Sequence, residues 1–144
     1  MNAIYGSSLL PKVFESFGSH KEDISFHEIF AIYGIYLSDY TVLDPIQTEA
    51  VVYAAISSLG LGGPGNWHLR GMGRMLGAHD QDTQSDEAKQ IIIELMNLRE
   101  AVMEIIRFVG NDYVARARLD KWATVDSMVR EFGGWGEKVD LGRI

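Results

Sequence analysis

One glutamate and one histidine lie on consecutive apolar segments, and they are residue types suited to proton transfer near neutral pH. Glu49 follows the start of a segment that opens at residue 43, and His68 comes nineteen positions later (68 − 49). Taken alone, each has a simpler interpretation. Glu49 could be a solvated first-turn acid that favours the helix dipole, and His68 a core histidine with one hydrogen bond.

The elements that must position this pair are expected to be helices. Apolar spacing, capping residues and glycines predict an all-α protein, a compact bundle of five to six helices in one domain covering residues 1–144. The expected helices cover residues 9–17, 22–37, 45–59, 66–77, 85–110 and 111–133, with a break allowed near Asn97. Ser85 or Thr83 is expected to cap the fifth. The tail 135–144 is expected to be loose or to dock on a neighbouring subunit.

The helix that carries Glu49 has the clearest boundaries. Asp44 is suited to cap it, Pro45 to occupy its first position, Gln47 to complete a capping box, and Gly60 to end it. Because this helix is apolar on most faces, it is predicted to be the buried central helix. A helix that needs partners on all sides also predicts a homo-oligomer, and the helix pattern does not choose between a dimer, a trimer and a hexamer.

The separation of the pair along the helices is a geometric difficulty. In a straight antiparallel hairpin Glu49 and His68 would be offset along the axis by on the order of 10 Å. They are expected to meet only if the helices cross steeply, if a water bridges them, or if a second subunit contributes.

Composition excludes several classes of function. The net charge of −7 and scattered basic residues argue against nucleic-acid binding. With no cysteine the chain has no disulfide, thiolate metal site or thiol nucleophile. The N-terminal residues do not resemble a signal peptide, and no window is long enough to span a membrane. The expectation is a soluble cytoplasmic protein.

Two further motifs have unremarkable interpretations. The glycine-rich residues 60–65 formally match a dinucleotide fingerprint, with Asp80 twenty positions on (80 − 60). The preceding segment is capped as a helix, so this segment is predicted to be an interhelical turn. His20, His27 and His79 lack metal-ligand spacing, and neither a metal nor a cofactor is expected. A flavin or haem oxidoreductase has no support beyond generic aromatic residues.

A family resemblance connects these residues. The string Leu-Asp-Pro-Ile-Gln-Thr-Glu at residues 43–49, the alanine-rich run after it and His-Leu-Arg-Gly at residues 68–71 resemble the core of the carboxymuconolactone decarboxylase family, which includes alkylhydroperoxidase D-like proteins. The likeness covers residues 26–77 well. It implies an alkylhydroperoxidase D-like fold, with His68 as the active-site histidine and Glu49 as its acid. The peroxidase branch has two cysteines near the positions of Leu61 and Pro64, and their absence removes disulfide-relayed peroxide reduction.

The resemblance therefore implies the cysteine-free branch, whose fungal members act in pathways to polyketide-derived compounds. It predicts a cofactor-independent decarboxylase, isomerase or cyclase that acts on a small carbonyl-rich metabolite. His68 would move a proton beside a carbonyl while Glu49 orients the imidazole. The alternative is a non-catalytic small-molecule-binding or structural subunit on the same scaffold.

Six residues are candidates for contact with a small-molecule substrate: Trp67, Tyr53, Arg70, Glu28, His27 and Tyr33. Arg70 could hold a carboxylate or enolate. It is two residues from His68, however, and such neighbours do not share a helix face. Pairing with Arg74 on a polar face, toward solvent or another subunit, is the simpler expectation. For His27 and Glu28 the simpler expectation is the edge of an amphipathic helix.

Overall fold

The computed structural model describes residues 1–78 and 85–109, and every regular element in these ranges is helical. This confirms the all-α prediction. The elements are α1 (Asn2–Glu15), η1 (Gly18–His20), α2 (Lys21–Phe26), η2 (His27–Tyr36), α3 (Pro45–Ser58), α4 (Gly62–Met75) and α5 (Asp86–Val109). The helix predicted at 111–133, the tail 135–144, the alternative cap Thr83 and the loop residues His79 and Asp80 lie outside the described residues.

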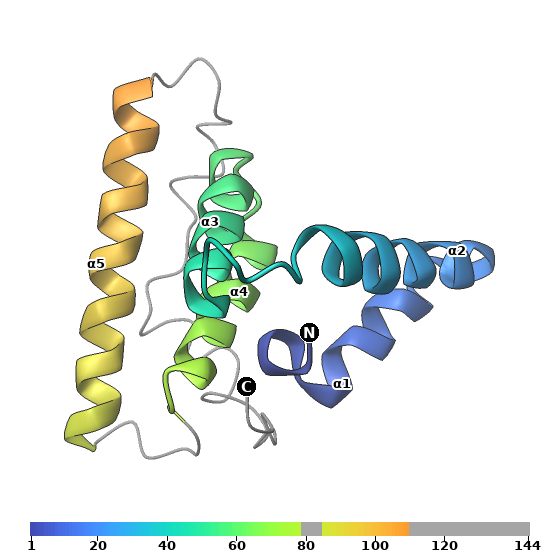
Figure 1. The fold of residues 1–144 in the computed structure, drawn as a ribbon, viewed down its shortest axis with the longest axis horizontal. Helices are drawn as coiled ribbons and strands as arrows, with labels where there is room; N and C mark the ends of the chain where they lie inside the picture. Colours follow the sequence, from blue (N-terminus) through green and yellow to red (C-terminus); the bar gives the residue numbers. More distant parts are fainter. Residues whose placement is uncertain (79–84, 110–144) are drawn as a thin grey trace.

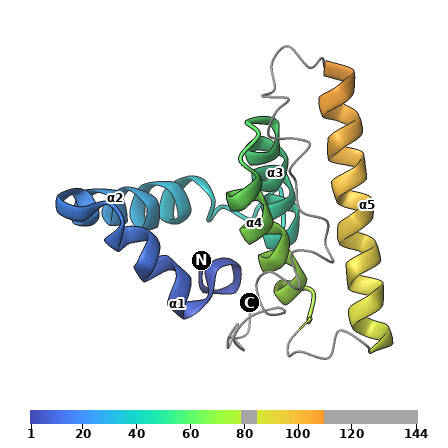
Figure 2. The same cartoon turned by 180° about the vertical axis from the view of Figure 1, so that it is seen from behind.

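The helices form two parts, a body made of α3, α4 and α5 and an arm made of α1, α2 and η2 (Figure 1). In Figures 1 and 2, α3 and α4 lie beside each other with α5 along one side, while α1 and α2 extend away on the other side. The hydrophobic core joins α3, α4 and α5 and extends to Ala78, three residues after the end of α4. Its buried members are Tyr53, Leu69, Met72, Ala78, Leu95, Val102, Met103 and Ile106.

The boundaries of α3 confirm the prediction from its caps. The Asp44 carboxylate accepts a hydrogen bond from the backbone N–H of Gln47 at 2.8 Å, and the Gln47 side chain accepts one from the N–H of Asp44 at 3.0 Å. Leu59 closes the last turn, and Gly60 follows with φ +69°, a conformation that glycine adopts without steric cost.

The buried central helix is α4, which corrects the prediction for the segment that became α3. On α3 only Glu49, Tyr53 and Ser57 are buried, whereas Val51 is 56% exposed. On α4 every residue from 68 to 74 is buried, although three of these residues are charged or ionisable and two are glycine. Hydrophobicity alone predicted the wrong buried helix. In α4 the glycines let neighbouring backbones approach, and the polar side chains reach partners inside the protein.

The helix α4 also begins earlier than predicted. Its first residue is Gly62, with Leu61 at the cap position and no side-chain cap, rather than after a cap at Asn66. Pro64 lies in the first turn, where its missing N–H costs no intrahelical hydrogen bond. The glycine-rich segment is therefore an interhelical turn only over its first two residues, and the rest is helix.

The first helix is longer than the predicted segment 9–17 and bends at its start. Gly6, with φ +71°, separates a short turn at residues 2–5 from the rest of α1. Arg74 on α4 holds this turn: its Nε donates to the carbonyl of Ala3 at 2.6 Å, and its terminal nitrogen donates to the carbonyl of Ile4. Arg74 is thus a buried side chain that fixes the first turn of α1, and it is not part of a polar surface as predicted.

The predicted helix 22–37 is present but changes its winding. Residues of α2 are α-helical, and the chain then continues as the π-helical segment η2. π-helical winding is rare and is often found at functional sites. It turns Tyr33 toward α1, while Phe26 and Phe30 stack on the exposed side with ring centroids 5.3 Å apart.

The fifth helix starts as predicted and has no break. The Ser85 hydroxyl accepts a hydrogen bond from the N–H of Ala88 at 3.1 Å, which confirms Ser85 as the cap. The helix then runs without interruption past Asn97 to Val109. Its inward residues contribute half of the core cluster.

Glycine at position 71 is required by the contact of α4 with the first turn of α1. A Cβ added there would lie 2.6 Å from the Cα of Ile4, so backbone would have to move. Gly71→Ala should therefore lower the free energy of unfolding by about 1–3 kcal/mol, measured by urea denaturation. Gly63→Ala on the same helix is the control: nothing lies within 4 Å of its added Cβ. It should be neutral or stabilising by up to about 1 kcal/mol. Equal effects of the two changes would contradict the close approach.

Candidate functional site

Glu49 and His68 form a direct hydrogen bond inside one chain. Oε2 of Glu49 lies 2.7 Å from Nδ1 of His68, and the two residues are 5% and 2% exposed. A carboxylate is acceptor-only, so Nδ1 carries the proton of this bond. The other ring nitrogen, Nε2, is then the acceptor in the neutral imidazole. Neither a bridging water nor a second subunit is needed to join the pair.

The early start of α4 explains why the two residues meet. Glu49 lies nine positions before the end of α3 (58 − 49), and His68 six after the start of α4 (68 − 62). The difference of three residues corresponds to an axial offset of roughly 4.5 Å at 1.5 Å per residue. Two side chains can span that distance. The larger offset expected from the sequence came from counting residues 62–65 as turn.

Two tyrosines continue the hydrogen-bonded line beyond the imidazole. The hydroxyl of Tyr5 lies 3.2 Å from Nε2 of His68 and 2.7 Å from the hydroxyl of Tyr33. The ring of Tyr5 also meets those of Tyr33 and His68 edge-on, with centroids 6.1 and 5.6 Å apart. The line therefore runs Glu49–His68–Tyr5–Tyr33 and joins α3, α4, α1 and η2.

Burial keeps the two phenols protonated. Burial raises the pKa of Tyr5, the hydrogen bond with Tyr33 lowers it, and the nearby Glu49 and Glu28 raise it. Burial also raises the pKa of Tyr33 strongly, and Tyr5 and the same two carboxylates add to the increase. Both side chains are thus neutral hydrogen-bonding groups throughout the ordinary pH range.

A cavity of about 170 Å³ lies between the arm and the start of α3. Its polar wall comes from Tyr33, Tyr40, Thr48 and Glu49, and Leu37 is among the apolar residues that complete it. His68 does not border this cavity. The two ends of the hydrogen-bonded line, Glu49 and Tyr33, both do.

The other predicted contact residues are distributed differently from the expectation. Trp67 is half-buried, and its ring is edge-on to Tyr5 at 6.3 Å. Tyr53 is 1% exposed and belongs to the core beside α5, and Arg70 is buried with its pKa lowered by desolvation. Glu28 is half-buried, and it influences both tyrosines electrostatically, whereas His27 is exposed. None of these five residues borders the cavity.

Arg70 corrects an expectation in particular. It was expected to face solvent or another subunit, but it is only 7% exposed. Its guanidinium is therefore inside the protein, and not in the wall where a substrate carboxylate would have to lie.

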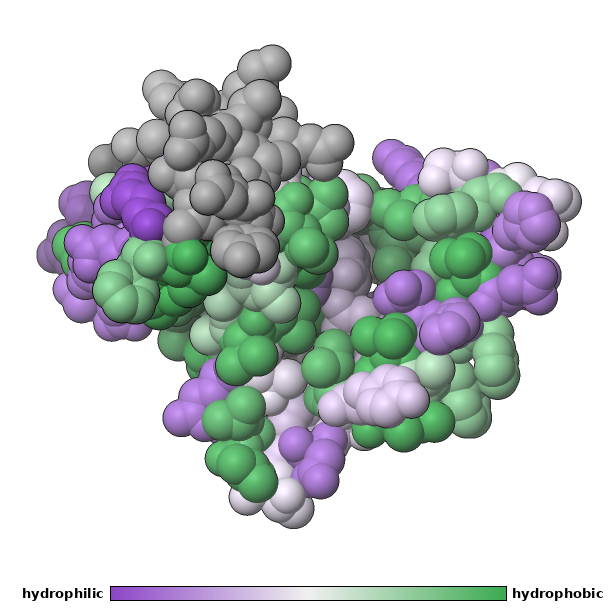
Figure 3. Space-filling model, turned by 90° about the horizontal axis from the view of Figure 1, so that it is seen from above, coloured by the Kyte–Doolittle hydropathy of each residue, from purple (hydrophilic) through white to green (hydrophobic). Residues whose placement is uncertain are grey.

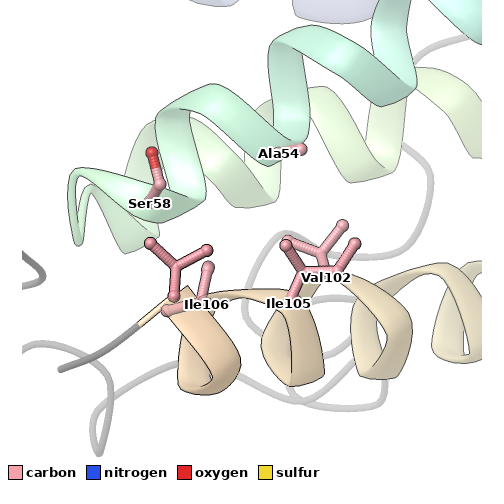
Figure 4. A pocket seen from close by; sticks show the side chains of 6 residues that line it. Ala54, Ser58, Val102, Ile105 and Ile106 are labelled. Carbon is pink, nitrogen blue, oxygen red and sulfur yellow. The ribbon is translucent and has the colours of Figure 1, made fainter.

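A second hollow lies between α3 and α5 and differs in chemistry. It has a volume of about 140 Å³ and is lined by Ala54, Ser58, Val102, Ile105, Ile106 and Val109 (Figure 4). None of its lining residues within 1–78 and 85–109 is ionisable. These residues therefore offer no group suited to acid–base chemistry, in contrast to the cavity beside Glu49.

Tyr5 is the member of the hydrogen-bonded line that the sequence did not reveal, and Tyr40 and Thr48 of the cavity wall were not predicted either. Tyr5 lies in a single turn before Gly6, where five residues are too few for a helical period to be recognised. The contact depends on Arg74 and Gly71, which are remote in sequence. The one local signal was a glycine next to a tyrosine near the start of the chain, and that pattern is not specific.

Comparison with known proteins identifies no relative: no family model, curated protein or solved structure matches the chain. No helix within residues 1–78 and 85–109 is long and apolar enough to cross a membrane. Across the same ranges, no three histidine, cysteine, aspartate or glutamate side chains form a group that could hold a metal ion. The function is therefore inferred from the chemistry of the Glu49 site.

Raised tyrosine pKa values predict a loss of stability in alkali. Tyrosines in the unfolded chain lose their protons near pH 10, whereas Tyr5 and Tyr33 hold theirs to higher pH in the folded state. Above about pH 10 the unfolded state binds fewer protons, so the free energy of unfolding falls as pH rises. Urea denaturation between about pH 8 and pH 11 should show this fall, and Tyr5→Phe and Tyr33→Phe should each make it shallower.

Tyr36→Phe is the matched control, because Tyr36 is on the same segment η2 but 73% exposed. It should retain the wild-type pH dependence. A fall of the same slope in all four proteins would show that the half-buried phenols of Tyr5 and Tyr33 are not responsible.

Proposed function

We propose that this protein is a cofactor-independent acid–base enzyme of the lyase or isomerase kind, which acts on a small carbonyl-rich metabolite. The family that its sequence resembles, carboxymuconolactone decarboxylase-like proteins without the peroxidase cysteines, fits this chemistry. One observation carries the proposal: a buried carboxylate–imidazole pair with an N···O distance of 2.7 Å lies beside a cavity that its carboxylate borders.

The residue types and their surroundings support acid–base chemistry. A carboxylate bonded to Nδ1 fixes the tautomer of an imidazole and stabilises its protonated form, which suits His68 to accept and return a proton. The two partners are nearly inaccessible to bulk water, where electrostatic interactions are stronger than at the surface. These groups need no bound cofactor to move a proton.

The size of the cavity bounds the substrate. A cavity of about 150 Å³ in another protein holds one benzene molecule, and this one has about 170 Å³. It fits one six-membered ring with a carbonyl or hydroxyl group. A fused polycyclic compound would have to leave most of its rings outside, so we favour a single-ring substrate or the single-ring end of a larger one.

A small-molecule-binding protein is the second candidate, and the burial of His68 favours it. Both ring nitrogens have protein partners, Glu49 and Tyr5, so the imidazole does not touch the cavity directly. A purely structural pair would look similar. The two candidates differ in whether loss of the pair abolishes turnover or only weakens binding.

Turnover by dyad variants tests the enzyme. We expect Glu49→Gln and His68→Gln each to lower kcat/KM by about 10²- to 10⁴-fold on a substrate accepted from a panel of cyclic enones, lactones and β-keto acids. Circular dichroism and thermal unfolding establish that each variant is folded. Glu94→Gln, an exposed acid on α5, should keep wild-type rates. Folded dyad variants with wild-type turnover would contradict the proposed roles.

Self-association is part of the same proposal. Phe26 and Phe30 form an exposed stacked pair, 67% and 62% exposed, and Val51 on α3 is also open. Figure 3 shows apolar side chains, in green, at the surface over much of this view. Exposed large aromatic groups in contact with each other are typical of association surfaces, and a second copy of the chain would cover them.

Light scattering coupled to size-exclusion chromatography should therefore give a mass of at least two chains. Phe26→Glu combined with Phe30→Glu should shift the protein toward the 16.1 kDa monomer, because burying two carboxylates in an apolar interface is costly. Lys12→Glu, an exposed change on α1, should leave the mass unchanged. A wild-type protein that is monomeric at high concentration would contradict the association.

A further inference from the structure

Four polar side chains form one line of hydrogen bonds whose inner members are shielded from the cavity. His68 contacts Glu49 on one side at 2.7 Å and Tyr5 on the other at 3.2 Å, and Tyr5 contacts Tyr33 at 2.7 Å. Of these, Tyr33 and Glu49 border the cavity. A proton can therefore reach His68 from the cavity side only through a neighbouring polar group.

We propose that Tyr33 is the catalytic residue that contacts the substrate, and that it exchanges protons with His68 through Tyr5. This relay rests on the acid–base function proposed above and assigns its substrate contact. Glu49 provides the negative charge that balances the imidazolium. Neither tyrosine corresponds to a residue of the motif strings at 43–49 and 68–71.

The proton movements balance in this arrangement. A substrate O–H or a C–H beside a carbonyl breaks, and its proton bonds to the oxygen of Tyr33 while the electron pair stays on the substrate as an enolate. The original Tyr33 proton moves to the oxygen of Tyr5, and the original Tyr5 proton moves to Nε2 of His68. The reverse sequence returns a proton to the substrate at a different atom, so the net reaction is an isomerisation without oxidation or reduction.

The transfers must be concerted, because a free phenolate is costly at either tyrosine. Burial and the carboxylates Glu49 and Glu28 raise the pKa of both phenols, so neither loses its proton before receiving another. The charge that forms is the imidazolium at His68, next to the Glu49 carboxylate. Placing the positive charge there separates it from the enolate by two side chains.

The cavity wall indicates a neutral substrate. Among the described residues it contains the hydroxyls of Tyr33, Tyr40 and Thr48, the carboxylate of Glu49, and Met1, whose α-amino group attracts Glu49 electrostatically; no lysine, arginine or histidine side chain borders it. Hydroxyl groups hydrogen-bond a ketone or enol oxygen, whereas a substrate carboxylate would compete with Glu49 for that amino group, whose pKa burial lowers. The ligand class is therefore a neutral single-ring ketone, enol or lactone.

Binding of a probe tests the relay without a known substrate. Cyclohex-2-enone is a neutral six-membered ring ketone, and cyclohex-1-ene-1-carboxylate is an anion with the same ring. We expect the enone to bind the wild-type protein more tightly than the anion. It should also move the Nε2 resonance of His68 in ¹⁵N-labelled protein, because a new bond to Tyr33 changes the bond of Tyr5.

Two variants distinguish contact with the ligand at Tyr33 from transmission to His68 through Tyr5. Tyr33→Phe should weaken enone binding by roughly two- to tenfold, the effect of one hydrogen bond, and remove the His68 response. Tyr5→Phe should leave the affinity within about twofold and still remove the response, since it interrupts the line beyond the contact. Tyr36→Phe, exposed on the same segment, should change neither quantity.

Several outcomes would overturn the relay. These are failure of the enone to bind, tighter binding of the anion, or a His68 response that persists in Tyr5→Phe.

Turnover measurements distinguish failure of the relay from failure of the proposed enzyme function. If Tyr5→Phe and Tyr33→Phe keep wild-type rates while Glu49→Gln is inactive, Glu49 acts on the substrate directly and the relay is wrong. If the enone moves His68 through Tyr5 but the dyad variants turn over like wild type, the acid–base enzyme is wrong and the hydrogen-bonded line belongs to a binding site.

Discussion

The hydrogen bond between Glu49 and His68 is the constraint on which the rest of the structure depends. It joins α3 to α4 where both side chains are almost completely buried, so each is the polar partner that the other needs. The bond forms only because the connection between the helices is short, with Gly60 in a left-handed conformation and Gly62 already helical. If residues 62–65 were turn instead of helix, the axial offset between the two side chains would grow by four residues, roughly 6 Å at 1.5 Å per residue.

A second set of contacts brings the tyrosines to the free side of the imidazole. Gly71 lets the first turn of α1 approach α4, and Arg74 holds the carbonyls of that turn. Tyr5 then lies against His68, and the π-helical winding of η2 brings Tyr33 to Tyr5. Gly71 and Arg74, which look like part of an ordinary Gly-Arg-rich segment, thus help to place Tyr5 between the imidazole and Tyr33.

In the proposed enzyme, ligand contact and proton storage lie in two different places. Tyr33 and Glu49 border the cavity and can contact a ligand, whereas the imidazole is buried and does not border it. In the proposed enzyme this separation would limit side reactions and would stabilise the ion pair that forms when His68 accepts a proton. The same burial would also suit a binding protein, and chemistry at Tyr33 and Glu49, rather than the existence of the pair, distinguishes the two functions.

Local sequence patterns were sufficient to predict the helical class, the capped start and glycine end of α3 and the Ser85 start of α5, because caps and periodicity are local properties. Glu49 and His68 were selected from their residue types together with the family resemblance. Tertiary structure decided that the pair meets directly, that α4 rather than α3 is the buried helix, and that Arg70 and Arg74 are inside. It also brought Tyr5 to the site. These depend on a few residues of helix register and on backbone approach at glycine, which no local pattern of hydrophobicity records.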